Sequence, residues 1–145
     1  MKPRLVFLPY LLFLCALGAC SRAPAPDDAA AALLEHDGRV AWQGMLACAD
    51  CDGIDTSLSL DRRGGQRDYL LIESYLTEGG AERFVERGRW QANDDALIRL
   101  RAIDGGERVY ALQADGRLQP RDTKGRRFAT RDGDFLMPAM ASSGQ

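Results

Sequence analysis

The chain has 145 residues, of which 46% are hydrophobic, and a formal net charge of −2 from 19 basic and 21 acidic side chains. This length and hydrophobic content suit one domain with a single core. The mildly acidic balance, without a basic cluster, excludes a basic nucleic-acid-binding domain, so no nucleic-acid partner is expected. Because His36 is the single histidine, histidine-based catalytic triads and histidine metal sites are excluded as well.

The first 19 residues have the pattern of an export signal. Basic residues give a positive start, and the apolar run that follows is too short to span a bilayer comfortably. The run ends in Leu17-Gly18-Ala19-Cys20, which resembles the bacterial lipobox, where the chain is cut before a lipidated cysteine. We therefore expect residues 1–19 to be a lipoprotein signal peptide and Cys20 to carry the lipid that anchors the protein to a membrane.

Residues 20–37 are expected to form a flexible tether between the lipid and the folded domain. They contain an Ala-Pro-Ala-Pro sequence, two aspartates and a run of alanines. Ser21 follows Cys20, and the absence of aspartate at this position favours the outer membrane by the sorting rule of enteric bacteria. The expected location is therefore the outer membrane, with the domain facing the periplasm.

From residue 38 to residue 136 the pattern is one of short strands separated by glycine-rich and acidic turns, with no strong helix. Ile54, Thr56, Leu58 and Leu60 alternate with polar residues, as expected for one face of a strand. Gly88 interrupts another strand and suggests a bulge or a bend. The predicted strands cover approximately residues 40–46, 54–60, 68–76, 83–90, 96–102, 108–113, the segment beginning at 118, and 127–130.

About eight strands with turns every 8–12 residues are typical of an all-β sandwich or barrel, and the hairpin connections favour an antiparallel meander. Residues 137–145 show no pattern and are expected to fray. The acidic residues mostly fall in turns or alternate outward, and no phosphate-binding loop is present, so the sequence predicts a protein that is not an enzyme.

Of the four cysteines, Cys15 and Cys20 lie near the N-terminus, so Cys48 and Cys51 are the two that belong to the predicted domain. A disulfide is the default for such a pair in an oxidising compartment. Binding of Cu(I) is the second interpretation, because thiolates are soft ligands. Thiol–disulfide exchange is the third, and it is disfavoured because a turn and a strand, not a helix N-terminus, follow the pair.

A Cu(I) site with two thiolates has room for a thioether ligand. Met45 lies three residues before Cys48, and Met137 and Met140 form a Met-x-x-Met pair near the end of the chain. Each of these methionines can equally be a space-filling or surface side chain. Asp50 is a hard ligand and is better explained as a turn residue.

The stretch Gly44-Met45-Leu46-Ala47-Cys48-Ala49-Asp50-Cys51-Asp52-Gly53-Ile54-Asp55-Thr56-Ser57-Leu58 resembles the signature of the NlpE N-terminal domain family. Within it, the motif residues are Gly44, Cys48, Asp50, Cys51, Gly53 and Ile54. The similarity continues through Tyr75-Leu76, Phe84, Gly88-Arg89-Trp90, Leu97-Ile98-Arg99-Leu100, Tyr110 and Leu118. It covers nearly the whole predicted domain, and the cysteine stretch is its specific part.

The resemblance implies a small, distorted β-barrel related to bacterial lipocalins. It also implies an outer-membrane lipoprotein that activates the Cpx envelope-stress kinase and is linked to copper homeostasis. Two departures are expected to matter: Ala47 stands where proline is common in the family, and the second, OB-type domain of longer members is expected to be absent.

The lipocalin relationship motivates a second hypothesis, in which the barrel binds a small hydrophobic ligand or a lipid. Trp42, Tyr75, Trp90 and Tyr110 are the aromatic residues that could line its cavity. The alternative is that these rings fill the interior, because small barrels usually hold side chains and little else.

Overall fold

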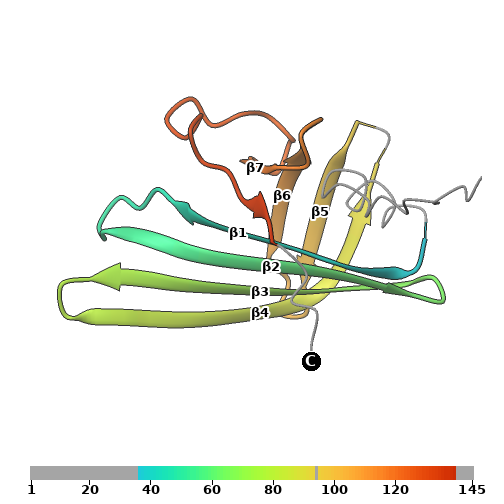
Figure 1. Ribbon diagram of the computed structural model, residues 1–145, viewed down its shortest axis with the longest axis horizontal. Coiled ribbons are helices and arrows are strands. Elements are labelled where there is room, and N and C mark those ends of the chain that lie inside the picture. The colour runs from blue at the N-terminus through green and yellow to red at the C-terminus, as the bar shows by residue number, and fades with distance from the viewer. Residues whose placement is uncertain (1–35, 94, 140–145) are drawn as a thin grey trace, which may run out of the picture.

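The computed structural model describes residues 36–93 and 95–139. They form one antiparallel sheet that curls into a nearly closed barrel, as Figure 1 shows. The strands are β1 (Gly38–Leu46), β2 (Gly53–Arg63), β3 (Gln66–Thr77), β4 (Gly80–Ala92), β5 (Leu97–Ala102), β6 (Glu107–Leu112), β7 (Leu118–Arg121) and β8 (Met137–Pro138). Strands β1 to β7 form a meander, so the predicted antiparallel all-β barrel is confirmed. Among the described residues there is no helix with the length and hydropathy needed to span a bilayer.

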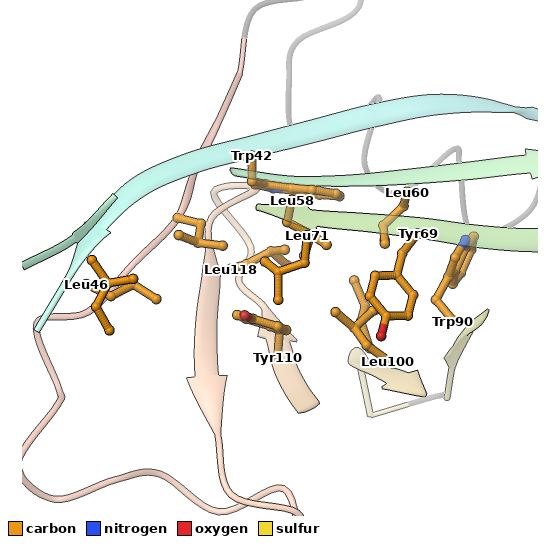
Figure 2. Packing of buried hydrophobic residues seen from close by; sticks show 13 residues of the cluster. Trp42, Leu46, Leu58, Leu60, Tyr69, Leu71, Trp90, Leu100, Tyr110 and Leu118 are labelled. Atoms are coloured by element: carbon orange, nitrogen blue, oxygen red, sulfur yellow. The ribbon is translucent and has the colours of Figure 1, made fainter. Parts of the chain in front are cut away.

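The alternation of residues in β2 explains how the barrel wall forms. Ile54, Thr56, Leu58 and Leu60 are buried, as predicted, whereas Asp55 between them is exposed. Burying one leucine side chain contributes about 1.5–3 kcal/mol, so repeated inward positions on several strands produce one continuous core. The buried core cluster (Figure 2) consists of Trp42, Leu46, Ile54, Leu58, Leu60, Tyr69, Leu71, Trp90, Ile98, Leu100, Tyr110, Leu118 and Leu136.

The barrel closes where the segment before β8 meets β7. The N–H of Leu118 donates to the carbonyl oxygen of Leu136 at 2.9 Å, and the N–H of Leu136 donates back at 2.8 Å. Strand β8 then pairs with β1, with Trp42 opposite Pro138. Buried Leu136 therefore joins the two edges of the meander.

This closure corrects two predictions made from the sequence. Residues 127–130 do not form a strand, because Arg127 makes a single isolated bridge to Arg121 and a turn follows. The segment predicted to fray instead begins with β8, Met137–Pro138, whose order comes from pairing with β1. A strand this short has no alternation for sequence analysis to detect.

Gly88 marks the point where β4 meets a second neighbour. It lies opposite Tyr69 in β3 and opposite Ala102 in β5, and neither ladder contains an extra residue, so of the two predicted alternatives, a bulge or a bend, the bulge is excluded. A Cβ atom at Gly88 would overlap the carbonyl oxygen of Arg101. Glycine is required here because the two backbones approach so closely.

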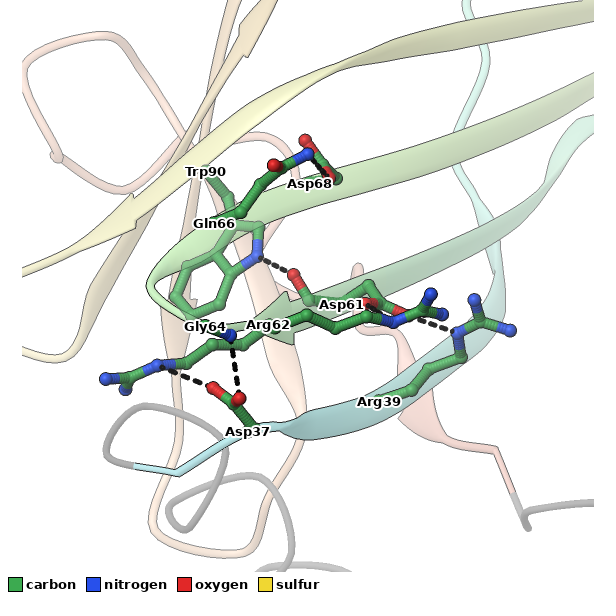
Figure 3. Close-up of polar contacts among 9 residues, drawn as sticks. Asp37, Arg39, Asp61, Arg62, Gly64, Gln66, Asp68 and Trp90 are labelled. Atoms are coloured by element: carbon green, nitrogen blue, oxygen red, sulfur yellow. Dashed lines mark hydrogen bonds and ion pairs between the residues drawn. The ribbon is translucent and has the colours of Figure 1, made fainter.

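Polar contacts hold the end of the barrel at the β2–β3 turn, as Figure 3 shows. The carboxylate of Asp37 accepts a hydrogen bond from the N–H of Gly64 at 2.7 Å. Asp61 accepts one from Nε of Arg39 at 2.8 Å, and its carbonyl oxygen accepts one from the indole N–H of Trp90 at 3.0 Å. These contacts fix the start of β1 and leave the opposite end of the barrel to the cysteine loop.

Candidate functional site

The cysteine loop is the segment 47–52 between β1 and β2. Cys48 and Cys51 are joined by a disulfide with Cα atoms 5.4 Å apart, and both pack against the core. At the start of the loop, the N–H of Ala47 donates to both oxygens of Asp134 at 3.2 and 3.3 Å. At its end, the N–H of Asp52 donates to the carbonyl oxygen of Leu76 at 2.8 Å. The loop is thus held at both ends independently of the disulfide.

Asp134 is the anchor that sequence analysis missed. Its side chain is buried, and it accepts a hydrogen bond from Nε of Arg131 at 2.6 Å in addition to those from Ala47. A hydrogen-bonded ion pair of this kind satisfies the buried carboxylate. The position looks like an ordinary turn aspartate in the sequence, so no pattern could assign it to the cysteine loop, 87 positions away.

The other motif residues support the loop from β1 and β2. Gly44 lies beneath residues 135–136, and a Cβ atom there would come within 2.5 Å of the carbonyl oxygen of Phe135. Gly53 and Ile54 are buried at the start of β2. Asp50 is exposed at the tip of the loop, consistent with a turn residue.

Met45 and Met137 differ from the cysteine pair in their exposure to solvent. Met45 is exposed on the outer face of β1, with its sulfur atom over Gly53. Met137 is also exposed and lies opposite Gln43, so it shares this outer face one strand away. The cysteines instead pack inward against the core. Cys20 and Met140 lie outside the described residues, and within the described ranges no three His, Cys, Asp or Glu side chains gather as they would around a metal ion.

A cavity of about 680 Å³ lies inside the mouth of the barrel, with the cysteine loop on its rim. Half-buried Tyr75 and exposed Phe84 meet edge to face on its wall, with ring centroids 5.3 Å apart. The lining residues are Cys48, Asp50, Cys51, Leu71, Glu73, Tyr75, Thr77, Glu82, Phe84, Val85, Glu86, Asp104 and Arg108. The five carboxylates in this list outnumber its one cation, so the cavity is acidic.

Arg108 joins two carboxylates across the floor of this cavity. Its Nη1 and Nη2 atoms donate to the two oxygens of buried Glu73 at 3.2 and 3.0 Å, and its Nε donates to Glu86 at 3.2 Å. Burial opposes the charged form of Arg108, but Glu73 and then Glu86 outweigh this effect and raise its pKa. The hydroxyl of Tyr69 donates to Glu86 at 2.8 Å. Burial, followed by this hydrogen bond, raises the pKa of Tyr69 above its ordinary value.

Glu73 is buried and is therefore an exception to the prediction that the acidic residues mostly lie in turns or point outward. The signal was present, because Glu73 follows Tyr69 and Leu71 at intervals of two, on the buried face of β3. A charge in phase with core residues requires a partner. The partner, Arg108, lies on β6 and reaches Glu73 through the curvature of the barrel, which a single sequence does not reveal.

Three of the four aromatic residues considered as cavity lining are in the core instead. Trp42 and Trp90 are 1% exposed and Tyr110 is 3% exposed. The indole N–H of Trp42 donates to the carbonyl oxygen of Gly116 at 2.8 Å. Tyr75 alone of the four lines the cavity. The other three rings fill part of the core, whereas the cavity beside the cysteine loop lies at the mouth.

Comparison with known proteins gives the same assignment as the cysteine motif. The model of the family described as "NlpE N-terminal domain" matches residues 42–131. Lipoprotein NlpE of Escherichia coli K12 is 36% identical over 87 residues, which are 58% of this chain and 34% of that protein. The match thus spans about a third of the relative's length, and no solved structure matches. Since the family model covers more than half of the chain, including the cysteine loop and the cavity walls, this protein belongs to the NlpE N-terminal domain family.

Proposed function

We propose that this protein is a non-enzymatic envelope lipoprotein, anchored through lipid on Cys20 to the outer membrane and facing the periplasm. Its role is envelope-stress sensing and copper homeostasis, with a Cpx-type sensor kinase as the partner. The observation that carries the proposal is the cysteine loop of a family member, placed at the rim of an acidic cavity. A partner that contacts this loop can detect whether the two cysteines form a disulfide or are reduced, and the barrel core does not have to change.

The anchoring of the loop supports this role. The carboxylate of Asp134 and the carbonyl oxygen of Leu76 hold its two ends by accepting hydrogen bonds from loop N–H groups, so a change at Cys48 and Cys51 alters the short span between them. As a disulfide, the pair fixes the turn; as thiolates, it offers two soft ligands that suit Cu(I). The two states present different shapes and charges at the same place.

The test uses a deletion strain that expresses the wild-type protein, Cys48→Ser with Cys51→Ser, or Ser57→Ala, an exposed change on β2, as a control that keeps the cysteines. We expect the double variant to reach the membrane in normal amounts but to lose copper tolerance or stress-reporter activation. Full copper and reporter responses in the double variant would overturn the role of the pair. Thiol trapping with and without copper, followed by Cu(I) competition, then separates a disulfide role from a metal role.

Lipid anchoring has its own test. Cys20→Ser should abolish incorporation of labelled palmitate and release the protein from the outer-membrane fraction. Cys15→Ser, which changes the neighbouring cysteine outside the lipobox, should do neither. Labelling that survives Cys20→Ser would contradict the anchor assignment.

The cavity supports a second function, binding of a small hydrophobic ligand or a lipid at the barrel mouth. Leu71, Tyr75 and Phe84 supply its apolar wall. Native mass spectrometry and fatty-acid displacement on the purified protein test this function. A clean spectrum of the protein alone, together with no displacement, would reject it.

A further inference from the structure

The strand edge beside the cavity is open. Strand β4 pairs with β3 along Gly80–Arg89, but it pairs with β5 over Gly88–Ala92 alone. Beyond that ladder, the N–H of Ile103 donates to the carbonyl oxygen of Arg87 at 3.0 Å. Among the described residues, the segment Gly80–Glu86, here called the β4 edge, therefore has β3 as its single ladder partner. Unpaired backbone groups on such an edge can accept a further strand.

The β4 edge carries negative charge on one face and positive charge on the other. Glu82, Phe84 and Glu86 lie opposite cavity-lining residues of β3 and face the cavity. Arg83 and Val85 face the other side. Phe84 is 49% exposed and Val85 is 47% exposed, so two large apolar side chains in the middle of the edge are in contact with solvent.

This charge pattern disfavours a second copy of the same chain. Antiparallel self-pairing about Phe84 places Glu82 opposite the second copy's Glu86, and self-pairing about Val85 places Arg83 opposite the second copy's Arg87. Centring on any other residue from 82 to 87 places a charged residue opposite itself. Like charges directly opposite one another destabilise a strand pair, so the edge requires a different sequence.

We propose that the β4 edge docks an extended segment of another protein as an added strand. Its side chains on the cavity side are basic, apolar and basic, opposite Glu82, Phe84 and Glu86. On the other side, an acidic residue lies opposite Arg83 and an apolar one lies opposite Val85. The cavity carboxylates beyond the edge, including Asp50 and Asp104, favour the basic side chains further. Backbone hydrogen bonds hold the segment, and the alternating charges select it.

This inference rests on the proposed function for its setting, because it identifies the surface that a signalling partner would use. Its chemistry is independent of the cysteine pair. A binding experiment on the edge and a stress-reporter experiment on the loop can therefore fail separately.

The test uses the full-length protein in detergent micelles and a dye-labelled peptide, Lys-Val-Leu-Glu-Lys-Thr-Glu, that complements residues 86 to 80 in antiparallel order. The control peptide, Glu-Val-Leu-Lys-Glu-Thr-Lys, has the same composition with the charges exchanged. We expect fluorescence anisotropy to show about tenfold tighter binding of the first peptide. Hydrogen–deuterium exchange should slow at the β4 edge when this peptide binds, and N-methylation of alternate peptide residues should abolish binding.

A charge exchange in the protein completes the test. Glu82→Lys with Arg83→Glu keeps the net charge and should weaken the first peptide and strengthen the control peptide. Arg101→Glu, an exposed change on β5, should leave the preference intact. Because Glu82→Lys also reduces the repulsion that opposes self-pairing, anisotropy is read at protein concentrations where sedimentation shows a monomer.

Equal affinity for the two peptides, insensitivity to N-methylation, or exchange protection elsewhere than the β4 edge would overturn the inference. Sedimentation of the wild-type protein as a dimer whose exchange protection lies on the β4 edge would also overturn it, in favour of a second copy. Loss of peptide binding with stress signalling intact would leave the proposed function standing without this surface.

Discussion

Removing the ion pair between Glu73 and Arg108 is the most direct test of what stabilises the floor of the cavity. Glu73 is 5% exposed, and both of its oxygens accept hydrogen bonds from Arg108. Arg108→Leu leaves this carboxylate buried without its cation. Glu73→Leu leaves a guanidinium that is 37% exposed and still has Glu86 as a partner. The first change should therefore cost more than the second.

We expect Arg108→Leu to lower the free energy of unfolding by about 3 kcal/mol, the lower end of the range for breaking a buried pair, because Arg108 reaches solvent. Glu73→Leu should cost about 1–2 kcal/mol. The double variant should lie within about 1 kcal/mol of the wild type, since apolar residues of similar volume replace buried ion pairs with little loss. The two changes are thus strongly non-additive.

Urea unfolding provides the assay, because Trp42 and Trp90 are both 1% exposed and their fluorescence reports loss of the core. Arg101→Leu is the control. This side chain is 64% exposed in its pair with Glu107, so its removal should change stability by less than about 1 kcal/mol. The reasoning would be refuted if Arg108→Leu cost no more than the control, or if the double variant showed the sum of the single effects.

Three further outcomes follow from the structure. Cys48→Ser with Cys51→Ser should lower the free energy of unfolding by about 2 kcal/mol, which is the loop-entropy contribution of so short a bridge, and the variant should keep the circular dichroism spectrum of a β-barrel. An unfolded spectrum would show that the fold depends on the disulfide. Gly88→Val should yield no folded protein, because its side chain meets the Arg101 carbonyl, and a wild-type melting temperature would contradict this. Burial raises the pKa of Tyr110 above its ordinary 10.0, so the folded state retains a proton that the unfolded state loses. The stability that this effect supplies is complete below pH 10 and is lost as the pH rises above it. When the free energy of unfolding is measured by urea unfolding at several pH values above 10, Tyr110→Phe should make its fall with pH less steep by up to about 1.4 kcal/mol per pH unit. An unchanged pH dependence in this variant would contradict the assignment.

The sequence predicted the walls of the barrel well because their physical cause is local. Ile54 to Leu60 and Ile98 to Leu100 alternate with the period of a strand, and glycine-rich turns such as the one at Gly64 separate them. Side chains that must face a core recur every second residue, whatever lies on the other side of that core.

The parts that sequence analysis missed depend on contacts between distant segments. Leu136 has no alternating neighbours, and it is buried because β7 pairs with it. Glu73 sits in phase with core residues, but Arg108 reaches it from another strand. The cavity follows from the open β4 edge, which results from the short pairing between β4 and β5. None of these relationships has a signature within a single strand.

The pair of backbone hydrogen bonds between Leu118 and Leu136 also determines when the barrel can close. The hairpins from β1 to β7 join neighbouring strands, so each can form as soon as its two strands are available. The contacts of the last segment join distant residues, such as Ala47 and Asp134, which are 87 positions apart, and their loop-closure cost is larger. We therefore expect closure to be the last step of folding. A chain that emerges N-terminus first keeps Trp42 and Leu118 beside an open side until Leu136 has emerged, so this interval is when its core is most vulnerable to aggregation.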